Sequence, residues 1–317
     1  MSLDLDERQR AMLKEMGVTV WWPNAQPADA KPMPAATIEV LNKSSKNNNN
    51  SEKNDIKSIN NGLNSIAKNQ INTWDNTEKY INENAENKYI TRFTSLENLN
   101  WPALQQTVAQ CRACALCEGR TQTVFGAGQT PANDEAAPVV DWLIVGEAPG
   151  ENEDRVGEPF VGQAGQLLDN MLKAMQLTRQ PRTPEATLAN GATRGVYIAN
   201  VIKCRPPGNR NPSAQEVAQC EPYLHRQIAL LQPKIILAMG KFAATSLLRA
   251  TMPDIDKTPL GRLRGQVHTY AHEGLSIPVV ATYHPAYLLR SLTEKAKSWE
   301  DLCLAMDALA QREATRG

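Results

Sequence analysis

Short apolar runs alternate with longer amphipathic stretches through the last two thirds of the chain. The apolar runs predict strands, and the stretches with apolar residues every three or four positions predict helices. The predicted strands are residues 139–145, 196–200, 234–239 and 278–282, and the predicted helices are residues 164–176, 214–231, 241–250 and 295–311. Apolar strands that alternate with helices are typical of a parallel sheet covered on both faces. The pattern therefore predicts a three-layer α/β/α domain with a mostly parallel central sheet over residues 101–317.

The predicted helix at 214–231 has the clearest local signals. Ser213 and Glu216 form a capping box at its start, and an apolar stripe that includes Cys220 runs along one face. Pro222 lies inside this pattern, which leaves open a kink or a break just after Cys220.

The composition changes abruptly before the α/β domain. Asn makes up 17 of the 60 residues at 41–100, interleaved with Lys, Glu and Ser. Such a segment buries too little apolar surface to offset the entropy of ordering its backbone, so it is interpreted as a disordered linker. An amino-terminal helix and extended segment are predicted at 1–40, where the adjacent Trp21 and Trp22 favour a docking anchor over a base-stacking platform.

Overall charge and hydropathy limit the classes of function. Lys plus Arg and Asp plus Glu both total 34, so the net charge gives no sign of nucleic-acid binding, and any basic surface must be local. The amino terminus lacks an apolar signal-peptide region, and no run approaches the ~18 apolar residues of a membrane span. We therefore expect a cytoplasmic protein with no membrane partner, long enough to be an enzyme.

The spacing of the six cysteines suggests a metal site. Cys111 and Cys114 form a C-x2-C pair, and Cys204 and Cys220 lie far downstream with fifteen residues between them. Four thiolates from two distant segments make a closed ligand set, which suits zinc as well as an iron–sulfur cluster. A core thiol at Cys220 and a redox C-x2-C motif are the simpler alternatives. Cys117 would be a fifth ligand and is left out of the set.

Three polar residues lie at the ends of predicted strands. Glu147, Asn200 and His284 are each at or just after the carboxyl end of a different strand. Parallel strands bring these ends to one edge of the sheet, where open α/β folds bind ligands. Each residue alone could be an ordinary loop acid, turn cap or turn histidine, but their coincidence predicts a shared active site.

The same residues lie within motifs that resemble those of the type 4, iron–sulfur-containing bacterial uracil-DNA glycosylases. The matching segments are Gly146-Glu147-Ala148-Pro149-Gly150 with Gly157-Glu158-Pro159-Phe160-Val161-Gly162, then Asn200-Val201-Ile202-Lys203-Cys204-Arg205-Pro206-Pro207, and finally His284-Pro285-Ala286-Tyr287-Leu288-Leu289-Arg290. The resemblance covers residues 105–312 and does not extend to the amino-terminal hundred. It implies the glycosylase fold and an enzyme that flips uracil out of DNA and hydrolyses its N-glycosidic bond, leaving an abasic site.

The resemblance also selects between the two kinds of metal site. It implies a [4Fe-4S] cluster with a structural role near the DNA surface, held by Cys111, Cys114, Cys204 and Cys220. Cys117 departs from the four-ligand pattern and is expected to stay free. The partner would be uracil-containing DNA, single- or double-stranded, bound by a monomer.

By the same resemblance, Glu147 and His284 are the catalytic residues. Hydrolysis passes through a cationic sugar while a uracil anion leaves, so the site must favour both charges. His284 would donate a hydrogen bond to uracil O2, as a neutral ring or an imidazolium, and Glu147 would position water or stabilise the sugar. Ala148, among the substrate-binding residues, stands where relatives outside the family carry a water-activating Asp, so the group that activates water is left open.

Recognition of the base would use three more side chains. Asn200 would pair with N3–H and O4, a pattern that cytosine reverses, and Phe160 would stack on the flipped base. Glu153 would crowd the C5 position and so exclude thymine.

The expected DNA contacts surround this pocket. Leu288 and its neighbours would fill the gap left by the flipped base, with the start of a buried helix as the alternative. Lys241 and Arg290 would contact phosphates, with a solvated basic face as the alternative. The competing function is a catalytically idle iron–sulfur DNA-binding module that recruits a repair or replication partner.

Overall fold

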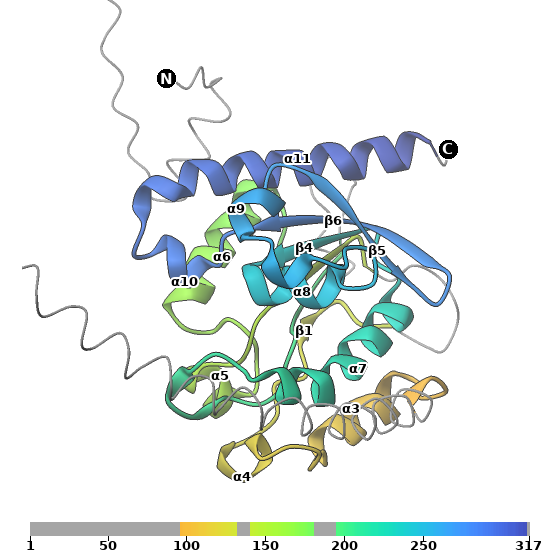
Figure 1. Ribbon diagram of the computed structural model, residues 1–317, viewed down its shortest axis with the longest axis vertical. Coiled ribbons are helices and arrows are strands. Elements are labelled where there is room, and N and C mark those ends of the chain that lie inside the picture. The colour runs from red at the N-terminus through yellow and green to blue at the C-terminus, as the bar shows by residue number, and fades with distance from the viewer. Residues whose placement is uncertain (1–95, 132–139, 181–194, 316–317) are drawn as a thin grey trace, which may run out of the picture. The chain divides into compact units, whose positions relative to one another are not determined.

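The computed structural model describes residues 96–131, 140–180 and 195–315 (Figure 1). They belong to one compact unit of the chain. The segment predicted at 1–40 and all but the last five residues of the linker predicted at 41–100 lie outside the described residues. Those five residues belong to the folded unit, because Leu96 is 5% exposed and packs in its core.

A six-stranded sheet forms the centre of this unit, in the order β1-β3-β2-β4-β6-β5. The strands are β1 (Ala127–Gly128), β2 (Trp142–Gly146), β3 (Val196–Asn200), β4 (Ile235–Met239), β5 (Val267–His272) and β6 (Leu275–Thr282). The four inner strands are parallel, and β1 and β5 pair antiparallel at the two edges. Gly146 pairs with Asn200, and Met239 pairs with Thr282, so the inner strands end together. The mostly parallel sheet is confirmed.

Helices cover both faces of the sheet. Successive residues of a strand point to opposite faces, so each strand contributes side chains to two cores. Leu143 and Val145 of β2 pack in one core, whereas Trp142 and Ile144 pack in another. The first core includes residues of α3 (Trp101–Ala109), α7 (Ala214–Leu231) and α8 (Lys241–Leu248), and the second includes residues of α6 (Gln163–Ala174) and α11 (Lys295–Ala314). Figure 1 shows α11 along the top and α7 with α3 toward the bottom, as a three-layer arrangement requires.

Most predicted elements occur within a few residues of their expected bounds. β3 and α7 match them, and α7 continues through Pro222 as one helix. The pattern missed β1 and β5, since β1 has two residues and most β5 side chains are at least partly exposed. β5 turns into β6 at Glu273 and Gly274, whose φ values are 46° and 78°.

Short helices complete the loops at the sheet edges. They are α4 (Leu116–Gly119), α5 (Glu151–Val156), α9 (Leu260–Leu263) and α10 (Pro285–Leu288), with 3-10 turns η1 (Pro207–Asn209), η2 (Ile255–Lys257) and η3 (Leu292–Glu294). Within the described ranges, no helix combines the length and the apolar character needed to cross a membrane.

Candidate active site

A cleft of about 690 Å³ opens at the carboxyl edge of the inner strands. Glu147 after β2, Asn200 at the end of β3 and His284 after β6 all line it, although they come from widely separated parts of the chain. The register of the parallel strands explains this, since it brings their ends to one rim. The predicted convergence of the three residues in space is therefore observed.

Glu147 occupies an unusual electrostatic position in this cleft. Burial raises the pKa of its carboxyl group to about 7, because removal from water disfavours the charged form. Its backbone carbonyl accepts a hydrogen bond from Ile202 N at 3.2 Å, which fixes the loop after β2 against the loop after β3. Near neutral pH, both protonation states of Glu147 are populated.

His284 is held as a neutral ring with a defined tautomer. The backbone N–H of Ala286 donates to His284 Nδ1 at 3.2 Å, so in the neutral ring the proton lies on Nε2. Burial, together with the positive charge of nearby Arg290, lowers the pKa of His284 to about 4. His284 is the N-cap of α10, and Pro285 starts that helix with the fixed φ that suits its first turn.

An aromatic ring and an amide close the pocket beside His284. The Phe160 ring stacks on the His284 ring with centroids 5.4 Å apart, and Phe160 takes a positive φ of 55° to bring its ring there. Asn200 is 2% exposed, and its Oδ1 has no hydrogen-bond partner in the part of the chain that the structure describes. A buried acceptor without a donor is costly, so this oxygen suits a ligand N–H.

Gly146 is what allows these side chains to approach the strand end. A Cβ at this position would lie 2.4 Å from Asn200 Oδ1 and 2.6 Å from Phe160 Cζ. Both distances are too short for any side chain, so glycine is required by the close packing of the pocket. Ala148, two residues later, is half-buried at the cleft wall.

Glu153 lines the cleft and also braces its loop. Its carboxylate accepts hydrogen bonds from the N–H groups of Gly150 at 3.1 Å, Val161 at 2.9 Å and Gly162 at 3.1 Å. These bonds close α5 onto the segment that carries Phe160. The contact of Glu153 with the C5 position of a base stays a prediction.

Two of the three predicted DNA contacts need correction. Leu288 is fully buried in the core between α6 and α11, so it is not available as a wedge; the exposed neighbours are Tyr287 at 38% and Leu289 at 40%. The Lys241 ammonium donates to the carbonyls of Ile255 and Thr258, so two of its three N–H donors are engaged by backbone and not presented to phosphate. Arg290 is exposed at the cleft, as expected.

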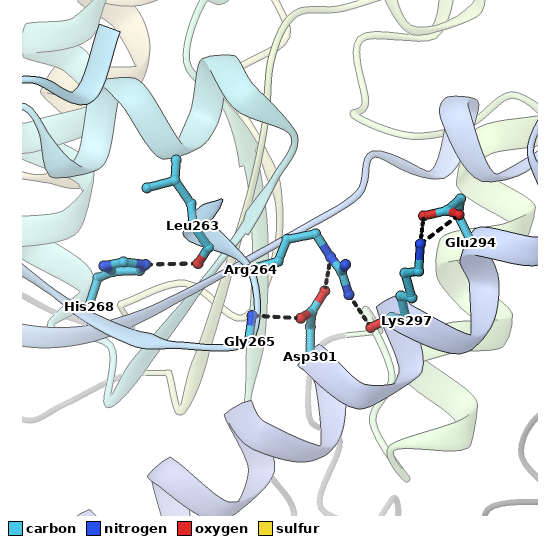
Figure 2. Close-up of polar contacts among 7 residues, drawn as sticks. All are labelled: Leu263, Arg264, Gly265, His268, Glu294, Lys297 and Asp301. Atoms are coloured by element: carbon cyan, nitrogen blue, oxygen red, sulfur yellow. Dashed lines mark hydrogen bonds and ion pairs between the residues drawn. The ribbon is translucent and has the colours of Figure 1, made fainter. Parts of the chain in front are cut away.

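Arg264, which lies behind the cleft wall, is also held within the protein. Its Nε donates to Asp301 at 2.6 Å, and Asp301 accepts the Gly265 N–H at 3.1 Å (Figure 2). The guanidinium lies 4.4 Å from the centroid of the Tyr283 ring, and Tyr283 lines the cleft next to His284. Arg264 therefore supports the cleft wall from behind.

The loop after β3 supplies a further cleft wall, beyond the motif that ends at Pro207. Asn209, Arg210 and Asn211 line it, and Arg210 makes a paired contact with Glu216 at 2.9 and 2.6 Å. This contact holds the pKa of Glu216 at about 2. The combination of Gly208 and Asn209, both with positive φ, is the local signal for such a tight turn.

A second pocket brings cysteines together. Cys111, Cys114, Cys117, Cys204 and Cys220 all line it. Within the described ranges, no group of three or more His, Cys, Asp or Glu side chains is arranged to hold a metal ion. Burial raises the pKa of the Cys220 thiol to about 12 and also raises that of Cys204, so bound metal would have to displace their protons.

The surroundings of these sulfur atoms fit a metal–thiolate group. The Arg120 guanidinium donates to Cys204 Sγ at 3.2 Å, and the Lys203 N–H donates to Cys220 Sγ at 3.2 Å. Such N–H groups stabilise thiolates in iron–sulfur sites. Cys117 lines the same pocket, so its distance from the site is not a reason to exclude it from the ligand set.

Comparison with known proteins identifies the family. The model of the uracil DNA glycosylase superfamily matches residues 134–303. The type-4 uracil-DNA glycosylase of Archaeoglobus fulgidus is 40% identical over 182 residues, which cover 57% of this chain and 79% of that protein. Those of Pyrobaculum aerophilum and Thermotoga maritima are 36% and 34% identical, covering 63% and 61% of this chain and 90% and 85% of their own lengths. These matches do not fix the source of the chain as bacterial, but they show that it belongs to the type-4 uracil-DNA glycosylase family.

Proposed function

We propose that this protein removes uracil from DNA in base excision repair, by hydrolysing the N-glycosidic bond of a flipped deoxyuridine and leaving an abasic site. The observation that carries the proposal is the unpartnered Oδ1 of Asn200, buried in a cleft beside the stacked rings of Phe160 and His284. Family membership supports the same reaction.

Uracil selection would come from Asn200 and Phe160. Uracil presents a donor at N3 and an acceptor at O4, which complement the carbonyl and amino groups of the Asn200 side chain. Cytosine presents the reverse pattern and would leave the buried oxygen unsatisfied. Phe160 would stack on the base after it has left the helix.

His284 would stabilise the leaving group. In the neutral tautomer set by the Ala286 N–H, Nε2 carries the proton and can donate to uracil O2 as negative charge develops there. Since the ring is neutral above about pH 4, this donation requires no protonation step.

Glu147 would act on the other half of the reaction. Its carboxylate would stabilise the cationic sugar or position the attacking water. Ala148 cannot activate water through its side chain, so the carboxylate of Glu147 is the group we assign to this task. With its pKa raised to about 7, this carboxylate is also a better proton acceptor than an ordinary glutamate.

DNA contacts would lie on the rim beside these residues. Tyr287 and Leu289, the exposed apolar residues after His284, would fill the gap in the base stack in place of the buried Leu288. Arg290 would contact a phosphate, since it is exposed at the cleft. A cytoplasmic location, action as a monomer and use of single- or double-stranded DNA are parts of the same proposal.

Type-4 uracil-DNA glycosylases typically bind a [4Fe-4S] cluster. In this chain Cys111, Cys114, Cys204 and Cys220 would hold it, joining the segment after α3 to the loop after β3 and to α7. Bound there, the cluster would supply structural support and no catalytic step.

The test is excision from a fluorescent oligonucleotide with one uracil, treated with iron-replete protein and then alkali. We expect cleavage at uracil, none at thymine, and a large loss in His284→Ala. His268→Ala is the matched control, because His268 lies on edge strand β5 and bonds there to Leu263 O at 2.8 Å, and it does not line the cleft. Full activity in His284→Ala would refute the mechanism, and salt-dependent DNA binding without cleavage by the native protein would favour the idle binding module.

A further inference from the structure

Lys203 is a buried lysine between the cysteine pocket and the uracil cleft. It is 1% exposed, and its Nζ donates to the backbone carbonyl of Asn200 at 2.8 Å and to Gln227 Oε1 at 2.6 Å. Gln227, itself fully buried on α7, donates to Phe125 O at 3.0 Å. The ammonium is thus held by groups from two segments, and Phe125 fixes the side chain of the second.

Lys203 has an unusual charge environment. Both hydrogen-bond acceptors of its ammonium are neutral, and none of the ion pairs found within 96–131, 140–180 and 195–315 includes this residue. A buried charge needs compensation by an opposite charge. Lys203 also contacts the sulfur site directly, because its backbone N–H donates to Cys220 Sγ at 3.2 Å and the residue lines the cysteine pocket.

The short turn that contains Lys203 physically joins the two sites. Its Val201 N–H donates to Gly146 O at 2.9 Å, and its Ile202 N–H donates to Glu147 O at 3.2 Å. The turn starts at Asn200 and ends at Cys204, so only three residues lie between the proposed base-reading amide and a proposed metal ligand. The ammonium of Lys203 folds back across this turn to the Asn200 carbonyl.

We infer that Lys203 is a positioning residue that couples the sulfur site to uracil recognition. Its charge balances the metal-bound thiolates of Cys204 and Cys220, and the same ammonium holds the backbone of Asn200 so that Oδ1 meets the base. This inference rests on the proposed function and on the proposed metal ligands. A metal–thiolate group would then stabilise the charged Lys203 and, through it, the geometry of the uracil pocket.

The test compares Lys203→Met with Lys234→Met in iron-replete protein. Lys234 is a matched control, because it forms ion pairs with Asp141 at 2.8 Å and Glu313 at 2.9 Å at the amino ends of β2 and β4. The cleft lies at the carboxyl ends of the same strands. Removal of a positive charge beside the cluster should lower its midpoint reduction potential, measured by voltammetry. Displacement of Asn200 should weaken inhibition by free uracil and raise KM roughly tenfold or more, with a smaller change in kcat. Lys234→Met should leave the potential, inhibition and KM unchanged.

A second variant keeps the inference testable if Lys203→Met does not fold. Gln227→Leu removes one anchor of the ammonium but keeps its charge, so uracil inhibition should weaken while the potential stays near the native value. Folded, iron-loaded variants at both positions with native inhibition by uracil would overturn the inference. Failure of the proposed function looks different, because the unmodified protein would then lack uracil excision or bound iron.

Discussion

Substitution of Gly146 by alanine tests the geometry of the cleft through a single methyl group. The added Cβ would lie 2.4 Å from Asn200 Oδ1 and 2.6 Å from Phe160 Cζ, whereas ordinary contacts begin at 3.4 Å. The amide must therefore retreat by about 1 Å, since 3.4 minus 2.4 is 1.0. A displacement of this size in a reacting complex costs on the order of 100-fold in rate. The forced repacking should also lower the free energy of unfolding by about 1–3 kcal/mol.

The assay is single-turnover uracil excision, with thermal unfolding measured on the same preparations. Gly261→Ala is the matched control, because a Cβ there meets nothing within 4 Å and its φ lies outside the left-handed region. We expect Gly261→Ala to retain native excision and Gly146→Ala to lose most of it while remaining folded. Native excision by a folded Gly146→Ala protein would show that Asn200 and Phe160 do not have to hold these positions, and would refute the reasoning.

Three further predictions concern protonation, the wedge and the cysteines. The raised pKa of Glu147 predicts that kcat/KM rises with pH through about 7 as the carboxylate forms. Glu147→Gln should lose this rise. If the rise persists in Glu147→Gln, another group must cause it. Leu288→Ala should lower the free energy of unfolding by about 2–5 kcal/mol, whereas Leu289→Ala should keep the native melting temperature and lose excision mainly from duplex DNA. Cys117→Ser should retain native iron content while Cys220→Ser loses it, and equal iron loss in both would add Cys117 to the ligand set.

The sequence contains enough information to bring the three strand-end residues of the cleft together, because a parallel sheet leaves little freedom. Glu147, Asn200 and His284 lie at strand ends, and the parallel register alone brings those ends to one edge. The protonation states could not be predicted in this way. They depend on burial by the whole fold and, for His284, on one backbone N–H from Ala286.

Cationic side chains were the harder group to assign from sequence. Lys241 and Arg264 have the charge and the nearby position of phosphate contacts. However, Lys241 donates to backbone carbonyls, and Arg264 donates to Asp301. Their partners lie between 14 and 37 residues away along the chain. Local sequence therefore shows that a charge is present, but only the tertiary structure shows whether it is free to bind DNA.

The error at Leu288 has a different cause, which is helical phase. Pro285 and Leu288 are the two buried residues of α10, and they are three positions apart, so both project from one face of the helix. That face packs inward, and Leu288 joins the core that includes residues of α6 and α11. The next residue, Leu289, is rotated by about 100° and becomes exposed. Pro285, directly after a possible cap residue, is a sequence signal for this one-turn helix. The directions in which its residues project would have selected Leu289 in place of Leu288 as the wedge.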